Sequence, residues 1–166
     1  MDVLTDAVPD AAADPVSGSR LKAKYRVGED GSKSYLPYVW YDSQRKEDCG
    51  FALAADGKER CLPVGTYNAA PGIYFSDAAC SISLALALYP GCDVKYVAGS
   101  KTNVSCQFTS TETQLFTLGA KANLATVYVK SGANCISTSG MGVELYEVGP
   151  EIPASSFVAG TVMVDP

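Results

Sequence analysis

Polar and apolar residues alternate along two stretches of the chain, and this pattern is the main structural signal in the sequence. The first stretch, Arg20–Val27, alternates without a fault over eight residues, which is typical of a half-buried strand. The second, Ser81–Tyr89, is rich in leucine and alanine, which favour helix. Its large apolar residues nevertheless recur with period two, and a helix would divide them between two opposing sides. We therefore predict a strand that contains Ile82, Leu84, Leu86 and Leu88.

Short β-type runs separated by Gly, Pro, Asn and Ser fill the rest of the chain. Asp56-Gly57 has the composition of a two-residue hairpin turn between Cys49–Leu53 and Lys58–Pro63. No stretch carries a convincing amphipathic helix, so the sequence predicts an all-β fold. Further strands are expected at Tyr35–Tyr41, Ile73–Phe75, Val94–Ala98, Gln107–Ser110, Gln114–Leu118, Ala125–Val129, Val143–Val148 and Phe157–Val164.

A short phrase, in which glycine stands three residues after an aromatic residue, recurs along the chain. A strand that ends in glycine, followed by a turn and a second strand, is its simplest interpretation, because glycine reaches positive φ without steric cost. The chain is then a series of degenerate hairpin repeats. The phrase occurs at Tyr25–Gly28, Tyr96–Gly99, Phe116–Gly119 and Tyr146–Gly149, with leucine in the aromatic position at Leu62–Gly65.

Hairpin repeats must protect their edge strands, so we expect them to form a small propeller-like or barrel-like closed antiparallel assembly. A β-sandwich is the alternative. The first strand, Leu21–Val27, and the last, Phe157–Val164, stand at opposite ends of the body's sequence. We predict that they lie close together in space and complete the closure.

The charge is unevenly distributed and divides the chain into a leader and a body. Residues 1–19 are rich in Ala, Asp and Pro, and their four aspartates account for −4 of the net charge of −5. We predict that this leader is a disordered acidic tether and that residues 20–166 form a single disulfide-bonded all-β domain. The nearly neutral body offers no basic footprint for nucleic acid. No apolar run is long enough for a transmembrane helix.

The six cysteines predict an oxidised protein. No Cys-x-x-Cys pair occurs and the chain contains no histidine, so the spacing fits neither a zinc site nor thioredoxin-like chemistry. Two gaps of twelve residues repeat, which predicts the pairings Cys49–Cys61 and Cys80–Cys92 and, by elimination, Cys106–Cys135. Sequence alone permits other connectivities. Disulfides indicate a location outside the cytosol.

Several segments of the chain form a recognisable combination. They are the acidic leader, Gly18–Leu21, Trp40–Asp42 with a following cysteine, Ala55–Gly57 before Arg60–Pro63, and Tyr74–Cys80. Together they resemble extracellular all-β domains of bacterial surface lipoproteins. The resemblance spans most of the body, but its motifs are structural, and no activity follows from it. It implies an extracellular or cell-surface module, lipid-anchored through a removed N-terminal segment.

The residue types argue against most catalytic chemistry. Without histidine, a Ser-His-Asp or Cys-His site is excluded, and the commonest general base and metal ligand is missing. Paired carboxylates are the remaining option, and they would support glycoside hydrolysis. We interpret them instead as solvated turn acids and expect no enzymatic activity, no cofactor and no metal site. The carboxylates concerned are Asp42, Glu47, Asp48, Asp77 and Asp93.

A cluster of aromatic residues around the only tryptophan is the most promising candidate for binding. Trp40 and Tyr41 are consecutive and point to opposite faces of a strand, and nearby tyrosines add stacking surface. A core tryptophan flanked by structural tyrosines is the competing interpretation. The predicted binding residues are Tyr35, Tyr38, Trp40, Tyr41 and Asp42.

We therefore expect a non-catalytic secreted or cell-surface module for binding or adhesion, with a glycan or a surface protein as its partner. A structural subunit of a cell-surface layer, filament or multidomain protein, which would self-associate, is the alternative. A carboxylate-based glycoside hydrolase ranks below both.

Overall fold

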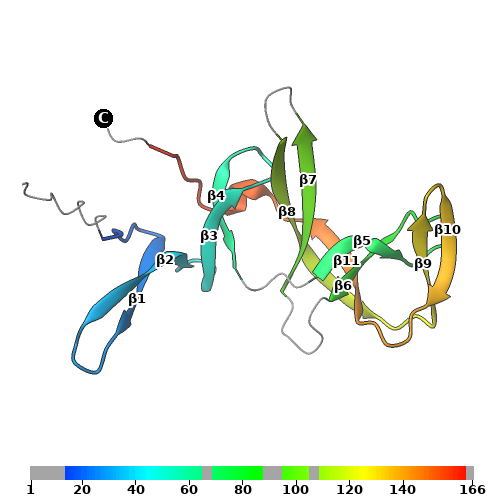
Figure 1. Cartoon of the computed structure of the whole chain (residues 1–166), viewed down its shortest axis with the longest axis horizontal. Coiled ribbons are helices and arrows are strands. Elements are labelled where there is room, and N and C mark those ends of the chain that lie inside the picture. Colours follow the sequence, from blue (N-terminus) through cyan, green and yellow to red (C-terminus); the bar gives the residue numbers. More distant parts are fainter. Residues whose placement is uncertain (1–13, 65–68, 88–94, 105–108, 164–166) are drawn as a thin grey trace, which may run out of the picture.

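The computed structural model describes residues 14–64, 69–87, 95–104 and 109–163, and in these ranges the protein is all-β, as expected (Figure 1). The strands are β1 (Leu21–Val27), β2 (Lys33–Asp42), β3 (Glu47–Leu53), β4 (Glu59–Pro63), β5 (Ala69–Phe75), β6 (Ser83–Ala87), β7 (Tyr96–Val104), β8 (Thr109–Ala122), β9 (Thr126–Ser131), β10 (Asn134–Ser139) and β11 (Leu145–Glu151), and a short 3₁₀ helix, η1 (Ala154–Ser156), follows them.

The strands form two sheets, one with four strands and one with seven. The first has the order β1-β2-β3-β4, and the second has the order β10-β9-β5-β6-β11-β8-β7. One parallel bridge, Ala69 to Val97, also joins β5 to β7. The described residues form neither a propeller nor a closed barrel, so the first expectation was wrong, and a sandwich-like arrangement fits the alternative. The physical reason is that β11 inserts between β6 and β8, which breaks the succession of neighbouring hairpins.

The two sheets meet at a shared apolar cluster. Ala54, which follows β3, and Leu62 of β4 pack there with Tyr96 and Leu115 from the second sheet. Phe157, which follows η1, is 2% exposed and belongs to the same cluster. This cluster holds the end of the chain between the sheets and so fixes η1 beside the turn that joins β2 to β3.

The residues after Phe157 lie beside β4. The Cys61 amide donates a hydrogen bond to the Val158 carbonyl over 2.9 Å, and the Gly160 amide donates one to Glu59, also over 2.9 Å. Val158 packs in one cluster with Leu21 of β1. The first and last segments of the body are therefore close, as expected, but β1 pairs with β2 in the described sheet and does not complete a closure.

The segment before β1 folds back along the outer edge of that strand. The Gly18 amide donates to the Leu21 carbonyl over 2.8 Å. The Ser17 hydroxyl accepts the Ala23 amide over 3.0 Å. In an antiparallel strand, residues two apart direct their backbone polar groups to the same edge. The two contacts therefore satisfy groups that point away from β2.

The strand predicted in the leucine-rich stretch is present as β6. Leu84 and Leu86 pack against Val127 and Leu145, which confirms that they share a face. Ile82 is 60% exposed because it lies before the strand begins, and Leu88 is outside the described residues. Polar β10 was not predicted, because its mostly exposed residues give no alternating signal.

The recurring glycines serve a different purpose from the one predicted. Gly28 follows β1 and enters a turn, but Gly99, Gly119 and Gly149 lie inside β7, β8 and β11. A Cβ added to Gly119 would lie 2.7 Å from both the Cβ and the carbonyl oxygen of Glu147. Gly119 and Gly149 therefore permit close approach of neighbouring backbones where the pairing of β8 and β11 is irregular. Gly65 is outside the described residues.

Two disulfides are present in the described residues, and only one joins a predicted pair. Cys49–Cys61 is confirmed, with Cα atoms 5.1 Å apart across β3 and β4. Cys80 pairs with Cys135, with Cα atoms 5.8 Å apart, so the predicted pairs Cys80–Cys92 and Cys106–Cys135 were wrong. The equal spacing of the cysteines gave the wrong pairing for Cys80 because β5 lies beside β9. This contact brings together the segments that follow the two strands. Cys92 and Cys106 are outside the described residues.

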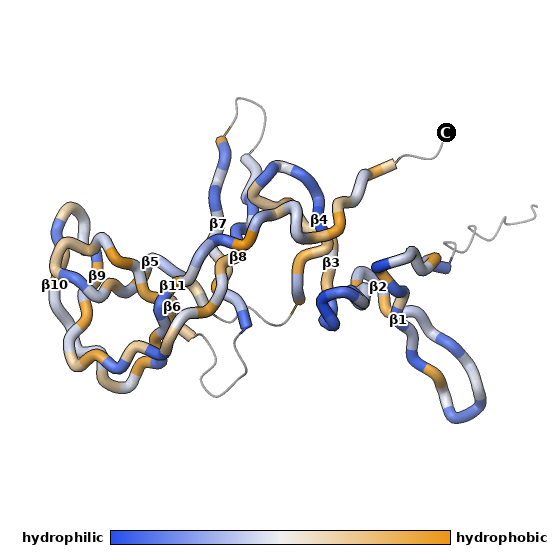
Figure 2. Tube along the Cα trace, turned by 180° about the vertical axis from the view of Figure 1, so that it is seen from behind, coloured by the Kyte–Doolittle hydropathy of each residue, from blue (hydrophilic) through white to orange (hydrophobic). Residues whose placement is uncertain are grey.

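Apolar positions are spread over the strands in short stretches interrupted by polar ones (Figure 2). In the described ranges, no helix has the length and apolar character needed to span a membrane.

Candidate functional site

The five residues predicted to form a binding site all belong to β2, but they do not come together. Trp40 and Asp42 share the inner face of the strand, because residues two apart in a strand point the same way. Trp40 is half-buried and packs against Leu21 and the Cys49–Cys61 disulfide. Asp42 is fully enclosed, with 0% exposure. These two residues serve mainly to hold the first sheet together.

The three tyrosines of the predicted site lie elsewhere on the same hairpin. The Tyr35 ring packs edge-on against the Tyr25 ring, with centroids 5.7 Å apart. Tyr38 is 89% exposed and has a positive φ of 63°. Tyr41 points outward and is 37% exposed. The pairing of β1 with β2 is irregular between Tyr35 and Trp40, and this irregularity separates Tyr35 from the tryptophan. Tyr41 follows Trp40 directly and points to the opposite face of the strand.

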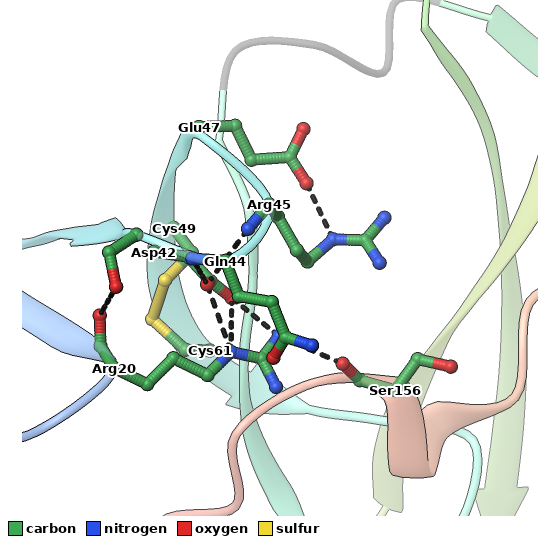
Figure 3. Close-up of a disulfide and its surroundings, with 9 residues drawn as sticks. Arg20, Asp42, Gln44, Arg45, Glu47, Cys49, Cys61 and Ser156 are labelled. Carbon is green, nitrogen blue, oxygen red and sulfur yellow. Dashed lines mark hydrogen bonds and ion pairs between the residues drawn. A yellow bond between two sulfur atoms is a disulfide. The ribbon is translucent and has the colours of Figure 1, made fainter.

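Asp42 is the centre of a polar cluster that joins three distant parts of the chain (Figure 3). Its carboxylate receives a two-pronged hydrogen bond from Arg20, whose Nε and Nη2 lie 2.9 and 2.6 Å from its oxygens. The backbone amides of Gln44 and Arg45 donate to the same carboxylate over 3.0 and 3.1 Å. Arg20 Nη2 also donates to the Ser156 carbonyl in η1 over 3.0 Å.

These contacts decide the charge of Asp42. Burial opposes ionisation of its carboxyl group, but the hydrogen bond from Arg20 and those from the Arg45 and Gln44 amides outweigh burial and lower its pKa. Asp42 is therefore a permanent anion at neutral pH. Its negative charge holds the Arg20 guanidinium in one orientation.

A second arginine in the same turn connects the two sheets. Arg45 Nε donates to Glu47 over 2.7 Å, and its Nη2 donates to the Tyr96 hydroxyl over 2.7 Å. The guanidinium carbon lies 4.5 Å from the centroid of the Phe157 ring and 5.6 Å from that of Tyr96. Lys95 also contacts Glu47, over 3.2 Å. Arg45 is thus fixed by an ion pair and by two rings.

The pKa values of this group follow from the same contacts. Burial acts to lower the pKa of Arg45, but hydrogen bonds to Glu47 and Tyr96 raise it overall. Burial raises the pKa of Tyr96, and the Glu47 carboxylate adds to this effect. Arg45 remains a cation and Tyr96 a neutral hydroxyl across the physiological range.

A pocket of about 610 Å³ lies over this cluster, lined by Arg20, Gln44, Arg45, Ser155 and Ser156. The backbone at Arg45 and Gln44 is held by Asp42, and the serines belong to η1. Among the described residues, Nη1 of Arg20 and Nη1 of Arg45 have no hydrogen-bond partner. The pocket is therefore rich in groups able to donate hydrogen bonds.

A smaller apolar groove of about 320 Å³ also borders Arg20. Trp40, Leu21, Phe51 and Val158 line it, together with Val16, Gly18 and Ser19. Phe51 is 41% exposed, so an aromatic edge is accessible there. Arg20 lines both the pocket and the groove.

The structure thus places Trp40 and Asp42 at a candidate site whose arginines were not predicted. Arg20 begins the alternating stretch in the sequence, and in the structure it reaches Ser156 across 136 positions of sequence. The charged residues that follow Asp42 were the only indication of this polar cluster in the sequence. They did not indicate which residues Arg45 contacts.

The carboxylates considered for glycoside hydrolysis are engaged in other contacts. Glu47 contacts Arg45, Lys95 and the Tyr96 hydroxyl. Asp48 pairs with Lys24 over 2.6 Å. Asp77 accepts the Ile82 amide and the Ser81 hydroxyl, and these bonds lower its pKa.

A general acid needs a raised pKa, which is the opposite of the shift at Asp42 and Asp77. Asp93 is outside the described residues. Among the residues that the structure describes, no three cysteine, aspartate or glutamate side chains form a group able to hold a metal ion.

Comparison of the chain with protein-family models, curated proteins and solved structures finds no match.

Proposed function

We propose that the protein is a non-catalytic, secreted or cell-surface binding module that recognises a glycan around Arg20. The observation that carries this proposal is the position of Arg20 between a polar pocket and an apolar groove lined by the only tryptophan. A sugar ring has an apolar face and a rim of hydroxyl groups. It therefore needs such a combination of surfaces.

The rigidity of the site supports this proposal. Arg20 is fixed by Asp42 and by the Ser156 carbonyl, and Arg45 by Glu47 and the Tyr96 hydroxyl. Side chains that are already ordered lose little conformational entropy when a ligand binds. Trp40 and Phe51 add aromatic surface of the kind that contacts sugar rings in wet sites.

The absence of catalysis is proposed from the chemistry of the lining residues. The described residues that line the pocket are arginine, glutamine and serine, and none of them is a carboxylate. Glycoside hydrolysis requires two carboxyl groups that flank the sugar. The pocket provides donors that orient a ligand and no group positioned to act as an acid.

The extracellular location is supported by the two disulfides, which are typical of oxidising compartments. A lipid anchor upstream of the acidic leader remains our proposal for attachment to the cell surface.

Titration of the protein with a panel of polysaccharides, followed by tryptophan fluorescence, tests the proposed function directly. Trp40 is the only indole, so the signal reports on the groove. We expect saturable quenching or a spectral shift that Phe51→Ala weakens. Tyr38→Ala is the matched aromatic control, because Tyr38 is exposed and does not line the groove. No saturable response to any polysaccharide, in fluorescence or in calorimetry, would reject the proposal.

A structural subunit that self-associates is the second candidate, and it rests on exposed apolar residues near both ends of the body. Val27 and Tyr38 on the β1–β2 hairpin and Val162 and Met163 near the C-terminus are all more than half exposed. Edge strands with such residues can pair between molecules. Sedimentation analysis tests this candidate, and a protein that stays monomeric at high concentration would rule it out.

A further inference from the structure

We infer that the glycan bound around Arg20 is acidic, with sugar units that carry carboxylate groups. This inference rests on the proposed function and names the ligand class of the same site. It follows from the hydrogen-bond donors of the pocket, its local charge and the neighbouring apolar groove.

The pocket offers hydrogen-bond donors and no fixed anion. Nη1 of Arg20 and Nη1 of Arg45 have no partner in the described part of the chain, and both residues line the pocket. The side-chain amide of Gln44 and the hydroxyls of Ser155 and Ser156 supply further donors. A carboxylate accepts several hydrogen bonds at once and donates none, so its requirements complement this lining.

The local charge balance is positive. Arg20 is neutralised by Asp42. Arg45 and Lys95 share the single carboxylate of Glu47, which leaves an excess of one positive charge at the base of the turn. Because Asp42 and Glu47 are buried and occupied by these cations, they do not present a negative surface to a ligand. An anion is therefore favoured over a neutral ligand of the same shape.

The apolar groove decides between an acidic sugar and other anions. Trp40 and Phe51 lie in the groove that shares Arg20 with the pocket. A uronate unit presents a carboxylate on a ring that also has an apolar face, so neighbouring units can occupy both surfaces. A carboxylate is planar and matches the two parallel N–H donors of an arginine guanidinium. A sulfated chain carries negative charge but lacks this planar acceptor.

The probes for a calorimetric binding experiment are polygalacturonate, its methyl ester, neutral dextran, dextran sulfate and polyglutamate. Two variants, Gln44→Glu and Ser155→Asp, place a negative charge in the pocket, where it would repel an anionic ligand. Both side chains are exposed and make no hydrogen bond in the described structure, so the variants should fold normally. Ser137→Asp is the matched control, because Ser137 is exposed on β10 at the far end of the molecule (Figure 1). Circular dichroism and thermal midpoints verify folding.

We expect the native protein to bind polygalacturonate and to lose most of its affinity for the methyl ester. Each pocket variant should weaken polygalacturonate binding by about tenfold or more, since a like charge then faces the ligand. Ser137→Asp should leave the affinity within about twofold, as expected for a charge at a remote exposed site. Raising the salt from about 50 mM to about 500 mM should weaken binding, because screening shortens the range of the attraction.

Several results would overturn the inference. They are equal binding of the methyl ester, equal binding of dextran sulfate or polyglutamate, or an equal loss in Ser137→Asp and Ser155→Asp. Binding of dextran with no preference for polygalacturonate would also overturn it, while leaving the proposed glycan-binding function intact. Failure of every polysaccharide to bind would instead reject the proposed function itself.

Discussion

The two sheets of this protein are held together in different ways. In the first sheet, buried polar side chains connect strands to turns and to the C-terminal segment, as at Arg20–Asp42 and at Arg60, which bonds to Asp56 and to the Phe157 carbonyl. In the second sheet, the connections are apolar clusters around Leu84 and Ala85 and close backbone contacts at glycines. A small sheet with few core positions relies on hydrogen bonds and ion pairs between side chains. The arginines that form them in the first sheet retain further N–H groups that can bind a ligand.

The disulfides give the largest expected contrast between the two regions. Cys80–Cys135 closes a loop with a sequence separation of 55, and Cys49–Cys61 one with a separation of 12. In the chain-entropy model, replacing Cys80 and Cys135 by alanine should cost about 4 kcal/mol of unfolding free energy, and replacing Cys49 and Cys61 about 3 kcal/mol. Denaturant unfolding measures both. Equal or reversed losses would show that native packing and not loop length controls the two bonds.

Removal of the cation from the buried pair should damage the first sheet almost as much. Arg20→Met leaves the enclosed Asp42 without its ionic partner and should lower the unfolding free energy by about 3 kcal/mol. Lys24→Met removes a cation from the partly exposed pair with Asp48 and should cost less than about 1 kcal/mol. The double variant Arg20→Met with Asp42→Leu should recover part of the loss. A loss in Arg20→Met no larger than in Lys24→Met would contradict this view of the first sheet.

A methyl group added at a strand glycine should test the close contacts of the second sheet. Gly119→Ala would bring the new Cβ to 2.7 Å from the Glu147 carbonyl oxygen. We expect a loss of about 2 to 3 kcal/mol, because backbone atoms cannot move aside as a flexible side chain can. Gly18→Ala is the control, since its nearest neighbour would be 3.8 Å away. Thermal or denaturant unfolding separates them, and similar stabilities would refute the close-approach explanation.

The smallest expected effect is on the pH dependence of the unfolding free energy. The pKa of Asp42 is lower in the folded protein than its ordinary value of 3.8, so the contribution of its ionised form is present at neutral pH. That contribution is lost as the pH falls below the ordinary value and through the folded pKa. Asp42→Asn should therefore make stability less dependent on pH in this acidic range. Unfolding curves measured at several acidic pH values would show this, and an unchanged dependence would exclude Asp42 as the cause.

The sequence predicted features that depend on neighbouring residues. The Asp56-Gly57 turn between β3 and β4 and the strand β6 follow from turn chemistry and from alternation. The insertion of β11 between β6 and β8 and the Cys80–Cys135 bond depend on segments far apart in the chain. The same is true of the contact between Arg20 and Ser156. Local sequence patterns do not indicate contacts between distant segments. The sequence therefore predicted Trp40 as a member of the candidate site, but it did not predict Arg20 or Arg45.

The fold-back of Ser17 and Gly18 onto β1 covers the outer edge of that strand. These residues occupy the Leu21 carbonyl and the Ala23 amide on an edge that would otherwise accept a strand from another molecule. Removal of the residues through Gly18 would leave these two backbone groups open to pairing with such a strand. Sixteen residues precede Ser17, and trimming that stops short of Ser17 keeps both contacts in place.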